Sequence, residues 1–112
     1  MEIIRKNIKY EVPIDLKFYN TFWKRFKGLM FKVKPLKQEG IIILPCNSIH
    51  MFFMFFSIDV IFINDEQRVL KTVNHLKPWR VVTPVRGAVA AIELPKGTIQ
   101  KYDIQPNDEI HY

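Results

Sequence analysis

Two acidic residues interrupt strand-like apolar segments, and their side chains are the ones best placed to do chemistry. Asp59 lies in the segment 58–63 and Glu93 lies in the segment 88–94, and the neighbours of both on either face are apolar. An unpaired charge buried in such a segment is too costly to keep, so each carboxylate must be paired or neutral. We therefore predict that Asp59 and Glu93 converge with His50 on one polar site.

The chain supplies cations that such a site would need. Arg25 and Arg86 are the cationic partners predicted for the two carboxylates. A polar cluster with shifted pKa values would suit a pocket for a small ligand. The alternative is structural: a carboxylate that accepts backbone amides or an arginine and so fixes a loop. Both interpretations stay open at this point.

His50 and Cys46 are the other candidates for chemistry. His50 could be a general base, a metal ligand or a satisfied core residue. His50, His75 and His111 lack the spacing of metal ligands, so no metal is predicted. Cys46 lies four residues before His50, about 13 Å away along a strand, and no catalytic-cysteine pattern surrounds it. We predict that Cys46 is neither disulfide-bonded nor catalytic, and no phosphate loop or other motif predicts a cofactor.

The aromatic run at residues 51–56 allows a binding interpretation as well as a core one. Exposed phenylalanines near basic residues can stack unpaired bases. Six consecutive apolar residues, however, place three on each face of a strand, and exposing either set would create a large apolar patch. The run is therefore predicted to be core, and Trp79, between Pro78 and Arg80, is predicted to be the exposed aromatic residue.

The positive charge is concentrated in the first part of the chain. The net charge is +6, and residues 1–40 hold ten Lys and Arg against four Asp and Glu. Within the block 17–37, Lys24, Lys27 and Lys34 are the candidates for weak, non-specific nucleic-acid binding. Such a block would also attract an anionic membrane surface or a phosphorylated ligand, and the simpler alternative is a solvated basic face.

Length and composition predict a single soluble domain over residues 1–112. The chain has 112 residues, 48% of them hydrophobic and 25% charged, as in ordinary globular proteins. The longest apolar stretch, residues 51–63, is too short to span a bilayer and is interrupted by Ser57 and Asp59. With one cysteine and no recognisable targeting segment at the start, a cytoplasmic location is expected.

The pattern of elements predicts a mainly β fold. Apolar residues from Phe22 to Met30 recur at helical spacing and predict one amphipathic helix over residues 21–31. The rest of the chain consists of short apolar segments punctuated by prolines, which favours a compact β-barrel or β-sandwich. The predicted strands are 8–12, 41–44, 49–56, 58–63, 68–73, 79–83, 88–94 and 108–112, with one helical turn at 98–102.

Several segments resemble the DUF 192 family, a domain of unknown function. The matching segments are Thr21 to Met30 with its Gly-Leu-Met end, Cys46 to Met54 with its Ile-His, residues 58–63, Glu93 to Gly97 and residues 104–110. Asn107 replaces the usual glycine, and Phe55 stands where the family often has Lys or Arg. The resemblance implies a small, mainly β fold without an established activity.

Taken together, these observations favour a non-catalytic binding module for an anionic small molecule or a protein partner. One alternative is a minor enzyme that uses His50 with Asp59 or Glu93 as acid–base groups. The other is a nucleic-acid binder that uses the basic block. An uncovered apolar patch would favour a protein partner, and a deep pocket with His50 and a carboxylate would favour the enzyme or the small ligand.

Overall fold

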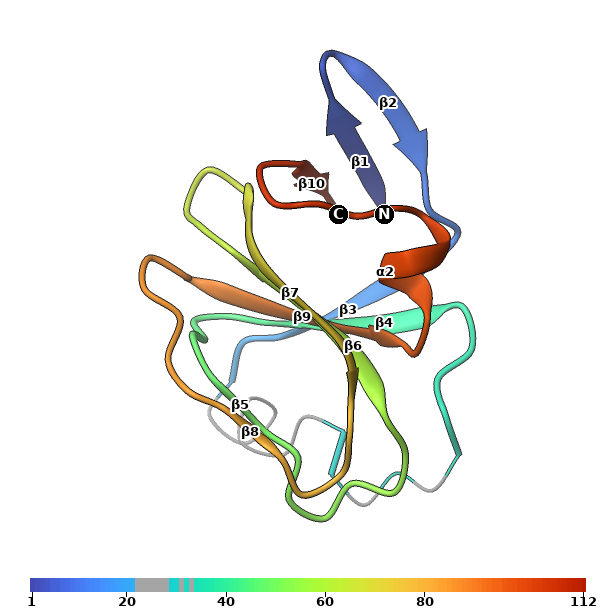
Figure 1. Cartoon of the computed structure of the whole chain (residues 1–112), viewed down its shortest axis with the longest axis vertical. Coiled ribbons are helices and arrows are strands. Elements are labelled where there is room, and N and C mark those ends of the chain that lie inside the picture. Colours follow the sequence, from blue (N-terminus) through green and yellow to red (C-terminus); the bar gives the residue numbers. More distant parts are fainter. Residues whose placement is uncertain (22–28, 31, 33) are drawn as a thin grey trace.

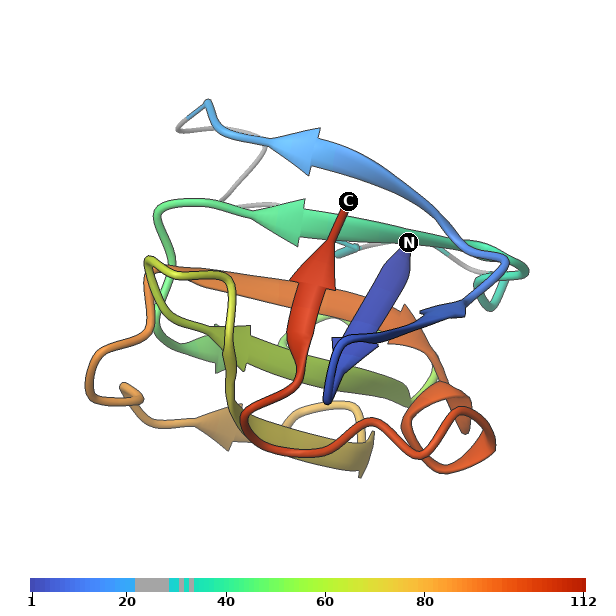
Figure 2. The same ribbon diagram turned by 90° about the horizontal axis from the view of Figure 1, so that it is seen from above.

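The chain is built around a five-stranded mixed sheet. The computed structural model describes residues 1–21, 29–30, 32 and 34–112. The central sheet has one parallel pair, β3 with β4, and its other pairs are antiparallel. In the order seen across Figure 2, its strands are β3 (Asp15–Tyr19), β4 (Glu39–Ile43), β9 (Ala90–Pro95), β6 (Ile58–Ile63) and β7 (Val69–Leu76).

Smaller elements cover the two faces of the central sheet. Figure 1 shows a three-stranded sheet and a short helix above it and a two-stranded sheet below it. The upper layer contains β10 (Glu109–His111), β1 (Glu2–Arg5), β2 (Ile8–Glu11) and α2 (Thr98–Lys101). The lower layer contains β5 (Ile49–His50) and β8 (Val81–Val82).

Two apolar clusters hold these layers together. The upper cluster joins Ile61 and Ile92 of the central sheet to Ile3 and Ile110 of the three-stranded sheet. The lower cluster joins the other face of the central sheet to β5, β8 and the loops beside them. Every residue of β6 is buried, which confirms the prediction that this strand is covered on both faces.

The mainly β prediction is confirmed, but the barrel alternative is wrong. In the described residues the sheets are open: β3 and β7 form the two edges of the central sheet and do not pair with each other. A barrel requires the edge strands to close on one another. Here smaller elements cover both faces of an open sheet instead.

The predicted helix over residues 21–31 falls largely outside the described residues, which include only Thr21, Leu29 and Met30 of that range. The helix that the structure describes, α2, lies close to the C-terminus, at the site of the predicted helical turn. Within the described part of the chain, no helix is long and apolar enough to cross a bilayer.

An ion pair fastens the first hairpin to the C-terminal loop. The Arg5 guanidinium donates to both carboxylate oxygens of Asp108, from Nε at 2.7 Å and from Nη2 at 2.7 Å. The backbone N–H of Gln105 also donates to Asp108, to Oδ2 at 2.8 Å. The hydrogen bonds to the Asp108 carboxylate raise the pKa of Arg5, so the guanidinium stays charged at every ordinary pH.

Candidate functional site

Asp59 lies in β6 and organises three backbone amides. Its Oδ1 accepts the His75 N–H at 2.9 Å, and its Oδ2 accepts the N–H groups of Gly97 at 3.1 Å and Ile99 at 2.9 Å. The β6–β7 ladder has an irregularity opposite Asp59, and His75 has a left-handed φ of 49° there. The carboxylate thus satisfies amides that the bulge and the first turn of α2 leave without ladder or helix partners.

Glu93 lies in β9 on the other face of the same sheet. It is aligned with Ile41 of β4 and Val60 of β6, and both of these belong to the lower apolar cluster. Its side chain is buried, and among the described residues its Oε2 has no hydrogen-bond partner. Burial raises the pKa of Glu93 to about 8, because the charged form is poorly solvated there.

The predicted convergence of Asp59 and Glu93 is therefore wrong. Asp59 is aligned with Leu94, a residue of the upper cluster, so the two carboxylates point to opposite faces of the sheet. The parity of the strands causes the separation, since a register offset by one residue moves a side chain to the other face. Asp59 has the structural role that the sequence left open, as an acceptor of backbone amides.

The cations predicted for these carboxylates do not complete a site either. Arg86 is exposed in the turn before β9, and among the described residues it pairs with neither Asp59 nor Glu93. Arg25 lies outside the described residues, as do Lys24 and Lys27 of the basic block. Lys34 is exposed just before β4.

The described contacts of His50 and Cys46 are with other residues. His50 lies in β5 with its ring 5.3 Å from the ring of Phe52, on the lower side of the sheet, whereas Asp59 faces the upper side. The Cys46 thiol is partly buried and donates to the Ser48 carbonyl at 3.0 Å. Across the described ranges, no three His, Cys, Asp or Glu side chains come close enough to hold a metal ion.

An exposed aromatic group stands where the sequence predicts core. Strand β5 ends at His50, and the following loop buries Met51 and Met54 but not the residues beside them. We call this group the aromatic surface, and its four members are Phe52 (43% exposed), Phe53 (45%), Phe55 (60%) and Trp79 (58%). The prediction that residues 51–56 form a core strand is wrong, and the prediction that Trp79 is exposed is confirmed.

The backbone holds these aromatic rings together. The Met51 N–H donates to the Arg80 carbonyl and the Trp79 N–H donates to the Met51 carbonyl, each at 2.7 Å, so the two loops are tied reciprocally. The Trp79 ring centroid lies 6.0 Å from that of Phe52 and 5.1 Å from that of Phe53. Phe53 and Trp79 have left-handed φ values of 60° and 65°, which turn the chain so that both side chains face outward.

Positive charge borders the aromatic surface. Lys77 and Arg80 are exposed on either side of Trp79. The two loops that form the surface, residues 51–57 and 77–80, contain no Asp or Glu. Asp65 and Glu66 belong to the turn at the far end of β6, about 20 Å along that strand.

Sequence reasoning missed this surface because it treated the run as one strand. A usable signal was present: Met51 and Met54 are three residues apart, a spacing typical of a turn that buries both and exposes the residues between them. The absence of acidic residues from both loops was the second signal, and it appears only when the two loops are considered together.

Comparisons with known proteins reveal relatives over nearly the whole chain. The model of the DUF192 family, described as "Uncharacterized ACR", matches residues 3–112. A UPF0127 protein of Pyrococcus furiosus is 37% identical over 107 residues, which cover 91% of this chain and 90% of that protein.

Two crystal structures share the fold at low sequence identity. A protein of unknown function from Novosphingobium aromaticivorans has a TM-score of 0.81 and 22% identity, over 99% of this chain and 82% of that one. A Sinorhizobium meliloti protein, named as a candidate transcription regulator, has a TM-score of 0.82 and 16% identity, over 96% of this chain and 88% of that one. At these identities the similarity shows the fold alone.

Proposed function

Because the chain belongs to the DUF192 family, which is described only as uncharacterised, we propose its function from its own surface: it is a non-catalytic binding module that docks on a partner through the aromatic surface. The supporting observation is the outward placement of four large aromatic side chains on two loops that are tied to each other. Exposed apolar groups of this kind are typical of interaction sites.

The cost of this arrangement supports the proposal. A bulky residue with a left-handed φ costs about 1–2 kcal/mol, and the chain has two such residues here, Phe53 and Trp79. Strained backbone of this kind is concentrated at functional sites.

The acid–base alternative lacks the contacts that it needs. A general base must lie within hydrogen-bond distance of its partner or substrate. Asp59 faces the opposite side of the sheet from β5 and is already bound by three amides. Glu93 has a buried Oε2 without a partner among the described residues, so this oxygen gives the acid–base alternative no support.

Site-specific photo-crosslinking tests the proposal. A benzophenone amino acid is placed at Val81, which is 55% exposed in β8 and two residues after Trp79, and the protein is irradiated in cells. Ile8, 54% exposed in β2, provides the matched control position at the other end of the molecule. We expect covalent adducts from position 81 that are absent from position 8.

The same experiment has a loss-of-function arm. The substitutions Phe53→Asn and Trp79→Asn remove the two aromatic rings while keeping residues that tolerate a left-handed φ. Adducts at position 81 should disappear in this double variant. Identical adducts at positions 81 and 8, or adducts that persist in the double variant, would reject the proposed function.

A further inference from the structure

We infer that the aromatic surface docks on the anionic surface of a lipid bilayer, an inference that rests on the proposed function and names its partner. The rings enter the interfacial region of the membrane, and the flanking cations contact lipid phosphates. Three features of the surface carry this inference: its position, its charge and the geometry of its rings.

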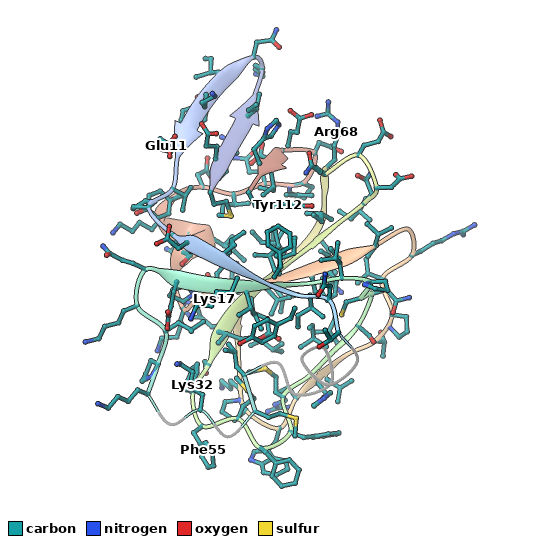
Figure 3. All side chains as sticks on the ribbon, turned by 180° about the vertical axis from the view of Figure 1, so that it is seen from behind. Glu11, Lys17, Lys32, Phe55, Arg68 and Tyr112 are labelled. Carbon is teal, nitrogen blue, oxygen red and sulfur yellow. The ribbon has the colours of Figure 1, made fainter. Side chains whose placement is uncertain are left out.

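The position of the surface favours a deformable partner. The molecule measures 39 × 26 × 21 Å, and Figure 3 shows Phe55 pointing outward at one end of the longest axis. Figure 1 shows the loops after β5 and β7 at that same end, opposite the β1–β2 hairpin. A protruding end needs a matching hollow in a protein partner, whereas lipids rearrange around it.

Two cavities that described residues line lie apart from the aromatic surface. One of about 220 Å³ is lined by Pro35, Leu36, Phe56, Ser57, Ile58, Pro95 and Lys96. Another, of about 300 Å³, lies beside Cys46 and Val89. Neither of these two cavities is lined by a residue of the aromatic surface, so neither supports a small-ligand site there.

The charge of the surface matches an anionic membrane. Lys77 and Arg80 flank Trp79, and the loops 51–57 and 77–80 carry no carboxylate that anionic lipids would repel. A lysine or arginine near an anionic bilayer strengthens binding about fivefold. Tryptophan is also enriched at the level of the lipid headgroups, where the amphipathic indole ring is stable.

The ring geometry favours a membrane over single-stranded nucleic acid. Bases stack on the open faces of aromatic rings. Here Phe53 meets Trp79 edge to face at 61°, and Phe52 is tilted by 40° to Trp79, so the rings partly cover one another's faces. This arrangement presents edges and apolar bulk, which suits immersion among acyl chains.

Vesicle flotation of the full chain tests the inference. The probes are neutral vesicles of phosphatidylcholine alone and anionic vesicles in which about 30% of the lipid is phosphatidylglycerol. The negative charge of the anionic vesicles attracts Lys and Arg side chains. We expect binding to the anionic vesicles, at least tenfold weaker binding to the neutral ones, and weakening as salt is raised.

Matched variants identify the surface that binds. Phe53→Asn with Trp79→Asn should weaken vesicle binding at least tenfold. Ile8→Thr with Tyr10→Thr removes apolar side chains that are 54% and 45% exposed at the other end, and binding should stay within twofold. Lys77→Gln with Arg80→Gln should weaken binding roughly 25-fold, from two cations at fivefold each. Circular dichroism confirms that each variant is folded.

The outcomes separate this inference from the proposed function. Equal binding to neutral and anionic vesicles, unchanged binding of the aromatic double variant, or no vesicle binding would overturn the lipid inference. Patch-dependent binding of a 20-nucleotide single strand without vesicle binding, or a dimer that the aromatic double variant abolishes, would also overturn it. In these cases crosslinks at position 81 would still support the proposed function, whereas their absence would reject both.

Discussion

On the face of the central sheet covered by β1, β2, β10 and α2, the buried carboxylates of Asp59 and Asp108 each accept three hydrogen bonds. On the face covered by β5 and β8, the buried Glu93 carboxyl has an oxygen with no partner among the described residues. Buried acidic residues thus differ between the two faces in their hydrogen-bond partners. Burial alone does not predict whether an acidic residue stabilises the fold.

The left-handed residues of the two sides differ in the size of their side chains. Beside the upper face, Asn7, Asp103 and Asn107 have short polar side chains that tolerate this conformation, and Lys6 and His75 adopt it there as well. Phe53 and Trp79, the aromatic residues with a left-handed φ among the described residues, lie beside the lower face. Left-handed backbone at bulky aromatic residues is thus found at the aromatic surface, as is typical of an interaction site.

The largest expected effect is on the upper face. Asp59→Ala should lower the free energy of unfolding by roughly 3–9 kcal/mol, because three amides lose their acceptor and each unsatisfied group costs about 1–3 kcal/mol. Asp65→Ala, in the exposed β6–β7 turn, should cost less than about 0.5 kcal/mol. Urea unfolding measures both.

Should Asp59→Ala fail to fold, Asp59→Asn keeps one acceptor oxygen and should give an intermediate loss. Equal stabilities of the Asp59→Ala and Asp65→Ala variants would contradict the structural role of Asp59, and with it the distinction between the two faces.

The second effect lies on the lower face and depends on pH. The pKa of Glu93 is about 8 in the folded chain against 4.5 for an ordinary glutamate, so the folded state holds an extra proton between these values. The contribution of Glu93 to stability is therefore full below about pH 4.5 and is lost as the pH rises through 8. Relative to Glu93→Gln, the wild-type chain should lose roughly 2–4 kcal/mol between pH 5 and 9.

Glu66→Gln, at an exposed position of the β6–β7 turn, is the control and should leave the pH profile unchanged. Parallel stability profiles for the wild type and Glu93→Gln would show that Glu93 titrates normally. A profile that becomes steeper in Arg25→Gln would instead assign Arg25 as its partner, as the sequence predicts.

The smallest expected effect concerns the strained loops. Trp79→Asn deletes the largest side chain type in proteins, yet the free energy of unfolding should change by less than about 1 kcal/mol, because relief of the left-handed backbone offsets the lost ring contacts. A loss above about 2 kcal/mol in thermal or urea unfolding would show that Trp79 belongs to the core and would remove the contrast between the faces.

The strands that the sequence predicted well are those that are buried most completely. The range 58–63 matches β6 residue for residue, because a run of β-branched and aromatic residues broken only by Asp59 is typical of an interior strand that is covered on both faces. The first and third strands, β1 and β3, were not predicted. Apolar and polar residues do not alternate regularly in either strand. In addition, β3 is an exposed edge strand, and its pairing with β4 depends on a distant part of the chain.

The candidate site was less predictable, for reasons of register and turn geometry. The apolar residues around Asp59 and Glu93 predict that both carboxyl groups are buried. The face of the sheet that each one occupies depends on which residue of β9 is aligned with Asp59, and the sequence does not give this register. Phe53 has a left-handed φ, a conformation that strand-like alternation does not predict. The strand that the apolar run predicted is therefore a loop after His50, which buries Met51 and Met54 and exposes Phe52, Phe53 and Phe55.

The place of β9 in the sheet has a consequence for how the chain folds during synthesis. β9 is the middle strand, yet β4 and β6, which it joins, precede it along the chain by about 30 to 50 residues. At ordinary translation speeds of about 5–20 residues per second, both strands wait for seconds with unpaired edges while residues up to 95 emerge from the ribosome. During that interval the β6–β7 hairpin can form locally, but the apolar edges of β4 and β6 are open to other chains. These edges are covered only when β9 inserts between β4 and β6 and completes the sheet.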